Sequence, residues 1–328
     1  MSMMTVAYVR HLVAGLSPAV ICQLFYVFSA ATVLAIAATP DSIQRLLMQY
    51  GARTSSNAPS SASYHDPGDN GRKVDSSVTK LSLRLIAPVT SAGKVPHSWF
   101  KHFYILSLTC TAFWAVQFVV RGSLVESIAK SQALKSSSSM TIDQVIFIWL
   151  LMGLQGARRL YEYLAVLRPS SSRMWIIHWL LGNAFYLCTS VSVWVEGSSS
   201  LLNYFDQDAS YSRVPPLKLV VGIPLFFFAW ITQYRCHRHL GSLPKYSLPN
   251  EGLFRYLICP HYTCECLIYL SMSVMAAPEG QYYNRTLACA VLFVLVNLGV
   301  TANGTKQWYY EKFGAIAQGR WKMIPFVF

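Results

Sequence analysis

Long apolar stretches separated by short polar segments dominate this chain of 328 residues. A helix that crosses a bilayer needs about 20 mainly apolar residues. The pattern predicts an all-α membrane protein with about seven transmembrane helices, and hydropathy supports the third and sixth of them least because both contain ionisable groups. The predicted spans are Ser17–Ala38, Phe100–Val120, Ile142–Leu167, Met174–Val195, Pro216–Tyr234, Tyr256–Ala276 and Thr286–Thr301.

Composition supports the membrane assignment. Hydrophobic residues make up 53% of the chain and charged residues 12%, with a mean hydropathy of +0.35, whereas soluble domains carry about 25% charged residues. A net charge of +13 would suggest a nucleic-acid partner in a soluble protein. Here the lysines and arginines fall between apolar stretches, which indicates membrane topology and anionic ligands instead. We therefore expect a membrane partner and no nucleic acid, and the sequence indicates no obligate protein partner.

The distribution of lysine and arginine also predicts the orientation. With the N-terminus in the lumen and the spans above, 20 of the 27 lysines and arginines fall on one side of the membrane. Such residues are retained on the cytosolic side, so we predict a lumenal N-terminus and a cytosolic C-terminus. Residues 53–77 are rich in serine, proline, glycine and aspartate, which predicts a disordered cytosolic insertion.

Ionisable groups next to or inside the predicted spans form three clusters, and such groups are costly in a membrane unless they are paired or hydrated. In the first cluster, Arg158 and Glu162 have the i,i+4 spacing of a structural ion pair. Arg159 has no carboxylate four residues away in either direction, so it is the better candidate for binding an anionic ligand. Two interpretations of the Arg158–Glu162 pair remain equal alternatives: it is purely structural, or it is part of a functional site.

The second cluster, residues 233–240, contains Arg235 and Arg238 just after the fifth span. It is explained either by topology alone or by a phosphate-binding loop, because guanidinium groups match phosphate oxygens. In the third cluster, residues 259–266, His261 and Glu265 share one helix face, and a buried carboxylate beside an imidazole favours a functional role. The cysteine spacing here does not match standard zinc sites, so we expect no metal.

Residues 306–328 combine aromatic and basic side chains, among them Tyr309 and Arg320. This composition fits an interfacial belt with cationic anchors or a ligand-binding tail. No glycine-rich dinucleotide fingerprint, P-loop or nucleophile elbow is present. A soluble-type Rossmann module is therefore excluded, whereas nucleotide binding is not.

Taken in order, these motifs resemble the steroid 5-alpha-reductase family, and within it the polyprenol reductase branch. The resemblance covers roughly residues 99–328 and implies a membrane catalytic domain there, preceded by residues 1–98 with an anchor helix and the insertion. It implies NADPH held in a cavity open to the cytosol, in a multi-pass protein of the endoplasmic reticulum membrane. It also implies a polyisoprenoid lipid substrate whose reduced product enters dolichol synthesis for protein N-glycosylation. The matching pieces are Trp99–Tyr104, Arg158–Glu162, Gln233–His237, Gly252–Tyr256, Cys259–Tyr262 with Glu265, and Trp308–Tyr309 leading to Ile324–Phe326.

The resemblance also implies roles for single residues. His261 and Glu265 correspond to a pair that meets the nicotinamide side of the cofactor, Tyr309 to a cofactor-contacting tyrosine, and Arg159 to an arginine near the cofactor phosphates. We assign the cations at the cytosolic rim, Arg235, Arg238 and Arg320, to cofactor binding as well.

One departure from the family pattern concerns the substrate. Steroid-reducing members carry His-Tyr-x-x-Arg where this chain has Gln155-Gly156-x-x-Arg159, so the tyrosine that polarises a steroid carbonyl is missing and the proton donor is unassigned. We expect the substrate to be the aldehyde, polyprenal, because an isolated alkene cannot stabilise the charge that hydride addition creates. His102, Tyr104 and Gln155 are the candidate donors to its oxygen. A steroid or enoyl-lipid reductase of the same fold, or a membrane methyltransferase, remains the alternative.

Overall fold

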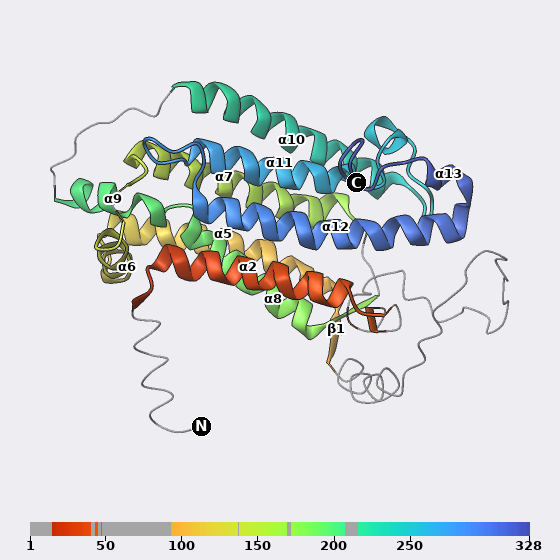
Figure 1. Ribbon diagram of the computed structural model, residues 1–328, viewed down its shortest axis with the longest axis horizontal. Helices are drawn as coiled ribbons and strands as arrows, with labels where there is room; N and C mark the ends of the chain where they lie inside the picture. Colours follow the sequence, from red (N-terminus) through yellow and green to blue (C-terminus); the bar gives the residue numbers. More distant parts are fainter. Residues whose placement is uncertain are drawn as a thin grey trace.

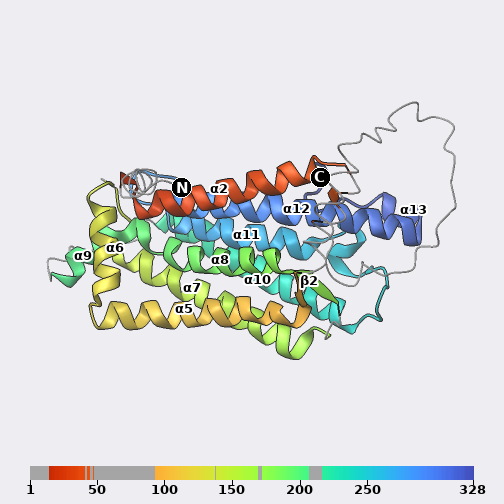
Figure 2. The same cartoon turned by 90° about the horizontal axis from the view of Figure 1, so that it is seen from below.

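The computed structural model describes residues 15–40, 93–136, 138–168, 172–206 and 216–328, with residues 43, 44 and 47. These residues form a bundle of long helices (Figures 1 and 2), each of which coincides with a predicted apolar stretch. The predicted insertion at residues 53–77 lies outside the described residues. The long helices are α2 (Pro18–Ala37), α5 (Lys101–Val119), α7 (Ile142–Tyr161), α8 (Ile176–Ser192), α10 (Pro216–Ser242), α11 (Pro260–Met275) and α12 (Arg285–Phe313).

Shorter elements connect and flank the bundle. α6 (Ser123–Ala133) lies across one end of it in Figure 2, near α9 (Ser198–Phe205), and α13 (Ala315–Gln318) lies near the other end. Strands β1 (Lys94–Pro96) and β2 (Arg173–Trp175) pair antiparallel, with Val95 opposite Met174. Short 3-10 turns cover His97–Phe100, Val195–Gly197 and Gly252–Arg255, and a π-helical turn, Glu162–Val166, continues α7.

Within the described part of the chain, five helical segments are long and apolar enough to cross a membrane. They are Pro18–Ala37, His97–Val119, Ile176–Phe205, Leu217–Ser242 and Arg285–Phe313. The two remaining predicted spans correspond to α7, whose end is charged, and to α11, which has only 16 residues. The described residues thus support a multi-pass membrane protein. Seven spans with a lumenal N-terminus and a cytosolic C-terminus remain a prediction.

Helix α2 begins at a capped N-terminus and packs along α12 and α8. Ser17 accepts a hydrogen bond from the Val20 amide, and Pro18 occupies the first helical position, where its missing N–H costs nothing. Further along α2, the Tyr26 hydroxyl lies 3.0 Å from the hydroxyls of Thr189 and Ser192 on α8. Such side-chain links hold helices together where no water is available.

The domain boundary at residue 98 stays a prediction.

Helix α10 is longer than the sequence predicted, and of the two interpretations of residues 233–240 the one that made this segment a loop is wrong. The helix continues to Ser242 because no glycine or proline interrupts the segment before Gly241, and because the polar residues Gln233 and His237 are buried against neighbouring helices. Helix α12 likewise continues past Tyr309 and ends at Gly314, whose φ of 63° favours glycine.

Several chain segments converge at the end of the bundle opposite α6 and α9 (Figure 1). They are the π-helical turn after α7, the last turns of α10, the start of α11 and the end of α12. The C-terminal segment secures the start of α11, since the amides of Ile258 and Cys259 donate to the carbonyls of Trp321 and Lys322 at 2.8 and 3.0 Å. This end of the bundle therefore carries the clusters of ionisable residues seen in the sequence.

Candidate functional site

A fully buried carboxylate, Glu162, forms the centre of the ionisable cluster. Its two oxygens make ion pairs with Arg158 and Arg159, and Oε2 lies 2.8 Å from Nδ1 of His237 on α10. The Glu162 side chain is 0% exposed and that of Arg158 4%. Arg158 also stacks over the Trp230 ring, 5.0 Å from its centroid. The electrostatic attraction offsets the cost of removing these charges from water only because each charge has close partners.

An amide network links this ion cluster to helix α11. Arg158 donates to Gln155 at 2.7 Å and also to Gln233. The side-chain nitrogens of Gln155 and Gln233 donate to the Glu265 carboxylate at 3.3 and 2.5 Å. Gln233 also donates to the backbone carbonyl of His261 at 3.0 Å. Glu265 and the start of α11 are therefore fixed by residues from α7 and α10.

Tyr104 extends the network to helix α5. Arg159 donates to the Tyr104 hydroxyl at 2.7 Å and lies over the same ring, 5.0 Å from its centroid. Because the tyrosine oxygen accepts this bond, its own O–H is left to donate to another group. On the other side, the imidazoles of His237 and His261 pack with centroids 5.5 Å apart. The site thus runs from Tyr104 through Arg159 and His237 to His261.

Arg159, which has no carboxylate four residues away, has one three residues away in Glu162. Glu162 pairs with both arginines, at i,i+4 from Arg158 and i,i+3 from Arg159. The helix changes to π geometry at Glu162, a deviation that is frequent at functional sites. Arg158–Glu162 is therefore a structural ion pair, and it also belongs to the network that holds Glu265.

The remaining predicted donor, His102, lies apart from this network. It packs between Trp99 and Trp179, with ring centroids 5.5 and 6.0 Å away. On helix α5, positions 102 and 104 face different directions, which explains why Tyr104 reaches Arg159 and His102 does not. Of the three predicted donors, the structure brings Tyr104 and Gln155 into the cluster.

The cations assigned to the cofactor lie around the rim of the site. Arg235 and Arg238 are exposed on α10, and the Arg238 guanidinium lies 6.0 Å from the Tyr234 ring centroid. Arg320 donates to the Pro249 carbonyl at 2.5 Å. Burial lowers the pKa of the Arg320 guanidinium, and the neighbouring Tyr309 phenol opposes that change. Tyr309 also packs against Trp308 and Phe313, with centroids 5.2 and 6.0 Å away.

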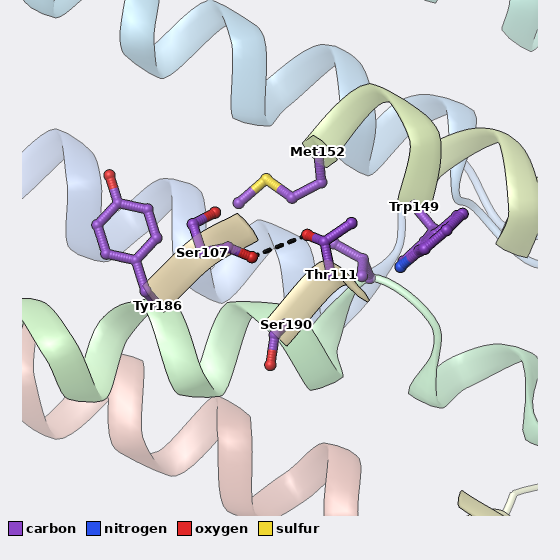
Figure 3. A pocket seen from close by; sticks show the side chains of 7 residues that line it. Ser107, Thr111, Trp149, Met152, Tyr186 and Ser190 are labelled. Atoms are coloured by element: carbon purple, nitrogen blue, oxygen red, sulfur yellow. Dashed lines mark hydrogen bonds between the residues drawn. The ribbon is translucent and has the colours of Figure 1, made fainter. Parts of the chain in front are cut away.

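A small pocket opens beside the network, between helices α5, α7 and α8 (Figure 3). Ser107 and Thr111 line it from α5, Trp149 and Met152 from α7, and Tyr186 from α8. The Trp149 indole nitrogen is buried and has no hydrogen-bond partner among the described residues. Among those same residues, no group of three or more His, Cys, Asp or Glu side chains is placed to hold a metal ion.

Sequence reasoning missed Gln233 and His237 as members of the site. Both are almost fully buried, at 2% and 5% exposure. Their i,i+4 spacing at the end of an apolar helix was visible, and it places both side chains on one face. The loop prediction for this segment obscured that signal, since a loop has no defined face.

Comparison with known proteins shows which family the chain resembles. A family model described as 3-oxo-5-alpha-steroid 4-dehydrogenase matches residues 172–328. The polyprenal reductase of Saccharomyces cerevisiae is 30% identical over 234 residues, covering 71% of this chain and 75% of that protein. Polyprenal reductase 2 of Oryza sativa subsp. japonica is 28% identical over 300 residues, covering 74% and 84% of the two chains. The polyprenal reductase of Caenorhabditis elegans is 26% identical over 278 residues, covering 74% and 88%.

A helical membrane bundle with a buried ionic network at one end, matched by a reductase family model, defines a membrane oxidoreductase that acts on carbon–carbon double bonds. The chain belongs to the steroid 5-alpha-reductase family, where its curated relatives include polyprenal reductases of plants, yeast and animals.

Proposed function

We propose that this protein reduces the α-isoprene double bond of polyprenal with NADPH, in the pathway that supplies dolichol for protein N-glycosylation. The names of the relatives support the substrate. The observation that carries the proposal is the network joining Tyr104, Arg159, Gln155 and Glu265 at one end of the bundle. It places a phenol with a free O–H beside a carboxylate–amide cluster.

An enal is the chemically suitable acceptor. Hydride adds at C3, and the electron pair of the double bond moves through C2 to the aldehyde oxygen, which gains negative charge. A proton added at C2 then completes the reduction. A preorganised donor aimed at that oxygen stabilises the transition state by about 2.7–4 kcal/mol. An alcohol substrate gains nothing from such a donor, because its oxygen does not take up the negative charge.

Tyr104 is the best placed of the predicted donors. Arg159 donates to its oxygen, which makes the phenol O–H a stronger donor. The Gln155 side-chain nitrogen already donates to Glu265 and Gln233, so its role is to orient the carboxylate. His102 lies among tryptophans and is the weakest of the three.

The residues at this end of the bundle fit a dinucleotide phosphate. When bound, NADPH supplies the hydride. Arg235 and Arg238 are exposed on α10. These groups are cationic hydrogen-bond donors, as phosphate oxygens require. His261, Glu265, Tyr309, Arg320 and Arg159 are the further proposed contacts, with Arg159 acting from within its ion pair.

The apolar surface of the bundle suits the rest of the substrate. Large hydrophobic side chains are exposed along the outer faces of the helices, among them Phe28, Val116 and Phe228 at 65%, 58% and 60% exposure. A long isoprenoid tail leaves sideways into the lipid, so only its head requires a fitted pocket. We place the protein in the endoplasmic reticulum membrane with the site facing the cytosol.

The deciding experiment uses the purified full-length protein with NADPH and either polyprenal or polyprenol. We expect reduction of the aldehyde and much slower or no turnover of the alcohol. Equal or faster turnover of the alcohol alone would reject the aldehyde assignment. A steroid enone serves as the third substrate, and we expect little turnover because Gly156 replaces the tyrosine that polarises a steroid carbonyl.

A further inference from the structure

Tyr186 lines the pocket and carries a phenol to which no other described residue is hydrogen-bonded. It lines the pocket from α8, beside Ser107 of α5 and across from Met152 of α7 (Figure 3). Its hydroxyl makes no hydrogen bond to any other residue that the structure describes. Tyr186 is only partly buried, and its oxygen is not among the described buried polar atoms that lack a partner, so this oxygen retains accessible surface. An accessible phenol at a pocket is able to donate a hydrogen bond to a group bound there.

The surroundings of Tyr186 connect it to the ionic network. Its ring packs edge-on against Tyr104, with centroids 6.1 Å apart, and it stacks on Phe103 at 6.2 Å. The Arg159 guanidinium in turn donates to the Tyr104 hydroxyl and lies 5.0 Å from the centroid of that ring. Two tyrosine rings from different helices, α5 and α8, thus lie side by side at the edge of the ionic network.

The missing side chain at position 156 provides the space. A Cβ atom on Gly156 would lie 2.9 Å from the Ser107 hydroxyl and 3.5 Å from Leu108. Ser107 lines the same pocket as Tyr186. A tyrosine at position 156 would therefore have to occupy the region next to Ser107, and glycine leaves that region to a ligand and to the phenols from the other two helices.

We propose that Tyr186 is a catalytic residue that donates a hydrogen bond to the C1 oxygen of the enal, as the second donor beside Tyr104. This inference rests on the proposed function. The oxygen gains charge when hydride adds at C3, and both phenols keep their protons during that step. Two phenols from α5 and α8 thereby replace the single tyrosine that steroid-reducing relatives carry on the helix equivalent to α7.

The test compares Y186F with the wild-type enzyme on a four-isoprene enal and NADPH. Removing one donor of this kind lowers kcat by about 10²–10³-fold. The melting temperature is expected to stay unchanged, because the hydroxyl has no described protein partner. The matched control is Y26F, which removes a hydroxyl bound to Thr189 and Ser192 of the same α8 and is expected to retain its kcat.

A second readout reports on the carbonyl directly. With NADP⁺ in place of NADPH, the same enal binds without turnover, and its C=O stretching band is measured by vibrational difference spectroscopy. We expect a higher frequency in Y186F than in the wild type or Y26F, since one hydrogen bond is lost. An unchanged band, a kcat within about threefold of wild type, or a Y186F protein that does not fold would each overturn the assignment. Absence of enal reduction by the wild type would instead refute the proposed function.

Discussion

Glu162 gives the sharpest test of the ionic network. The substitution E162Q keeps the shape of the side chain and removes its charge. In the structure this carboxylate is 0% exposed and pairs with Arg158 and Arg159, whose side chains are 4% and 15% exposed. Without it, the buried Arg158 guanidinium is linked to a described carboxylate only through Gln155 and Gln233, which bind Glu265. The partly buried Arg159 retains only its contacts with His237 and Tyr104 among the described side chains.

The expected loss of stability follows from the burial. Breaking a buried ion pair by removing one partner costs about 3–5 kcal/mol. At about 2–4 °C per kcal/mol for a domain of 150–250 residues, the melting temperature should fall by about 6–20 °C. E162D keeps the charge on a shorter side chain and is expected to recover part of this loss. Activity should fall as well, because Arg158, which donates to Gln155 and Gln233, would lose the carboxylate that holds it in position.

The assay is thermal unfolding of the purified protein in detergent, followed by intrinsic fluorescence. The matched control is E126Q, which breaks the i,i+4 pair of Glu126 with Lys130 on α6, where the side chains are 42% and 63% exposed. That variant should melt with the wild type, since exposed pairs contribute little. A melting temperature of E162Q within about 2 °C of the wild type would refute the claim that these charges are desolvated. Such a shift is smaller than the one expected from breaking a buried ion pair.

Three further predictions follow from close approaches in the bundle. Replacing Gly156 with leucine should destabilise the protein by about 1–3 kcal/mol, as overpacking does, and lower activity, because the new Cβ would lie 2.9 Å from the Ser107 hydroxyl. The additional change Ser107→Gly removes that hydroxyl and should restore part of the stability and of the activity in melting and turnover assays. Gly241→Ala should lower the melting temperature, because its Cβ would lie 2.4 Å from a backbone carbonyl oxygen. Gly304→Ala on α12 is the control: its Cβ would meet nothing within 4 Å, and the change should be neutral or stabilising by up to about 1 kcal/mol. Equal melting temperatures of the two variants would contradict this prediction. Asn284 lies in a glycosylation sequon but is 0% exposed and caps α12, so glycosidase treatment should leave the mobility of the protein unchanged on a gel, and a shift lost in an N284Q variant would show the prediction to be wrong.

The sequence alone determined the helical membrane fold. Hydropathy needs only about 20 apolar residues in a row to indicate a membrane helix, and each predicted stretch coincides with a helix of the structure. The i,i+4 spacing of Arg158 with Glu162 also predicted their ion pair, since that contact depends on one helix only. The family motifs alone indicate His261, Glu265 and Arg159 as candidate site residues.

Only the tertiary structure decided which of these residues share a site. Tyr104 meets Arg159 and His237 meets Glu162 because α5, α7 and α10 pack at one end of the bundle, and a single chain sequence does not specify packing between distant segments. The same holds for Tyr186 of α8, whose ring packs against Phe103 and Tyr104 of α5. The sequence left open whether the end of α10 is a loop, because its polar residues do not indicate that neighbouring helices will satisfy them. Packing against those helices gives the polar side chains at the end of α10 their partners, which buried ionisable groups require.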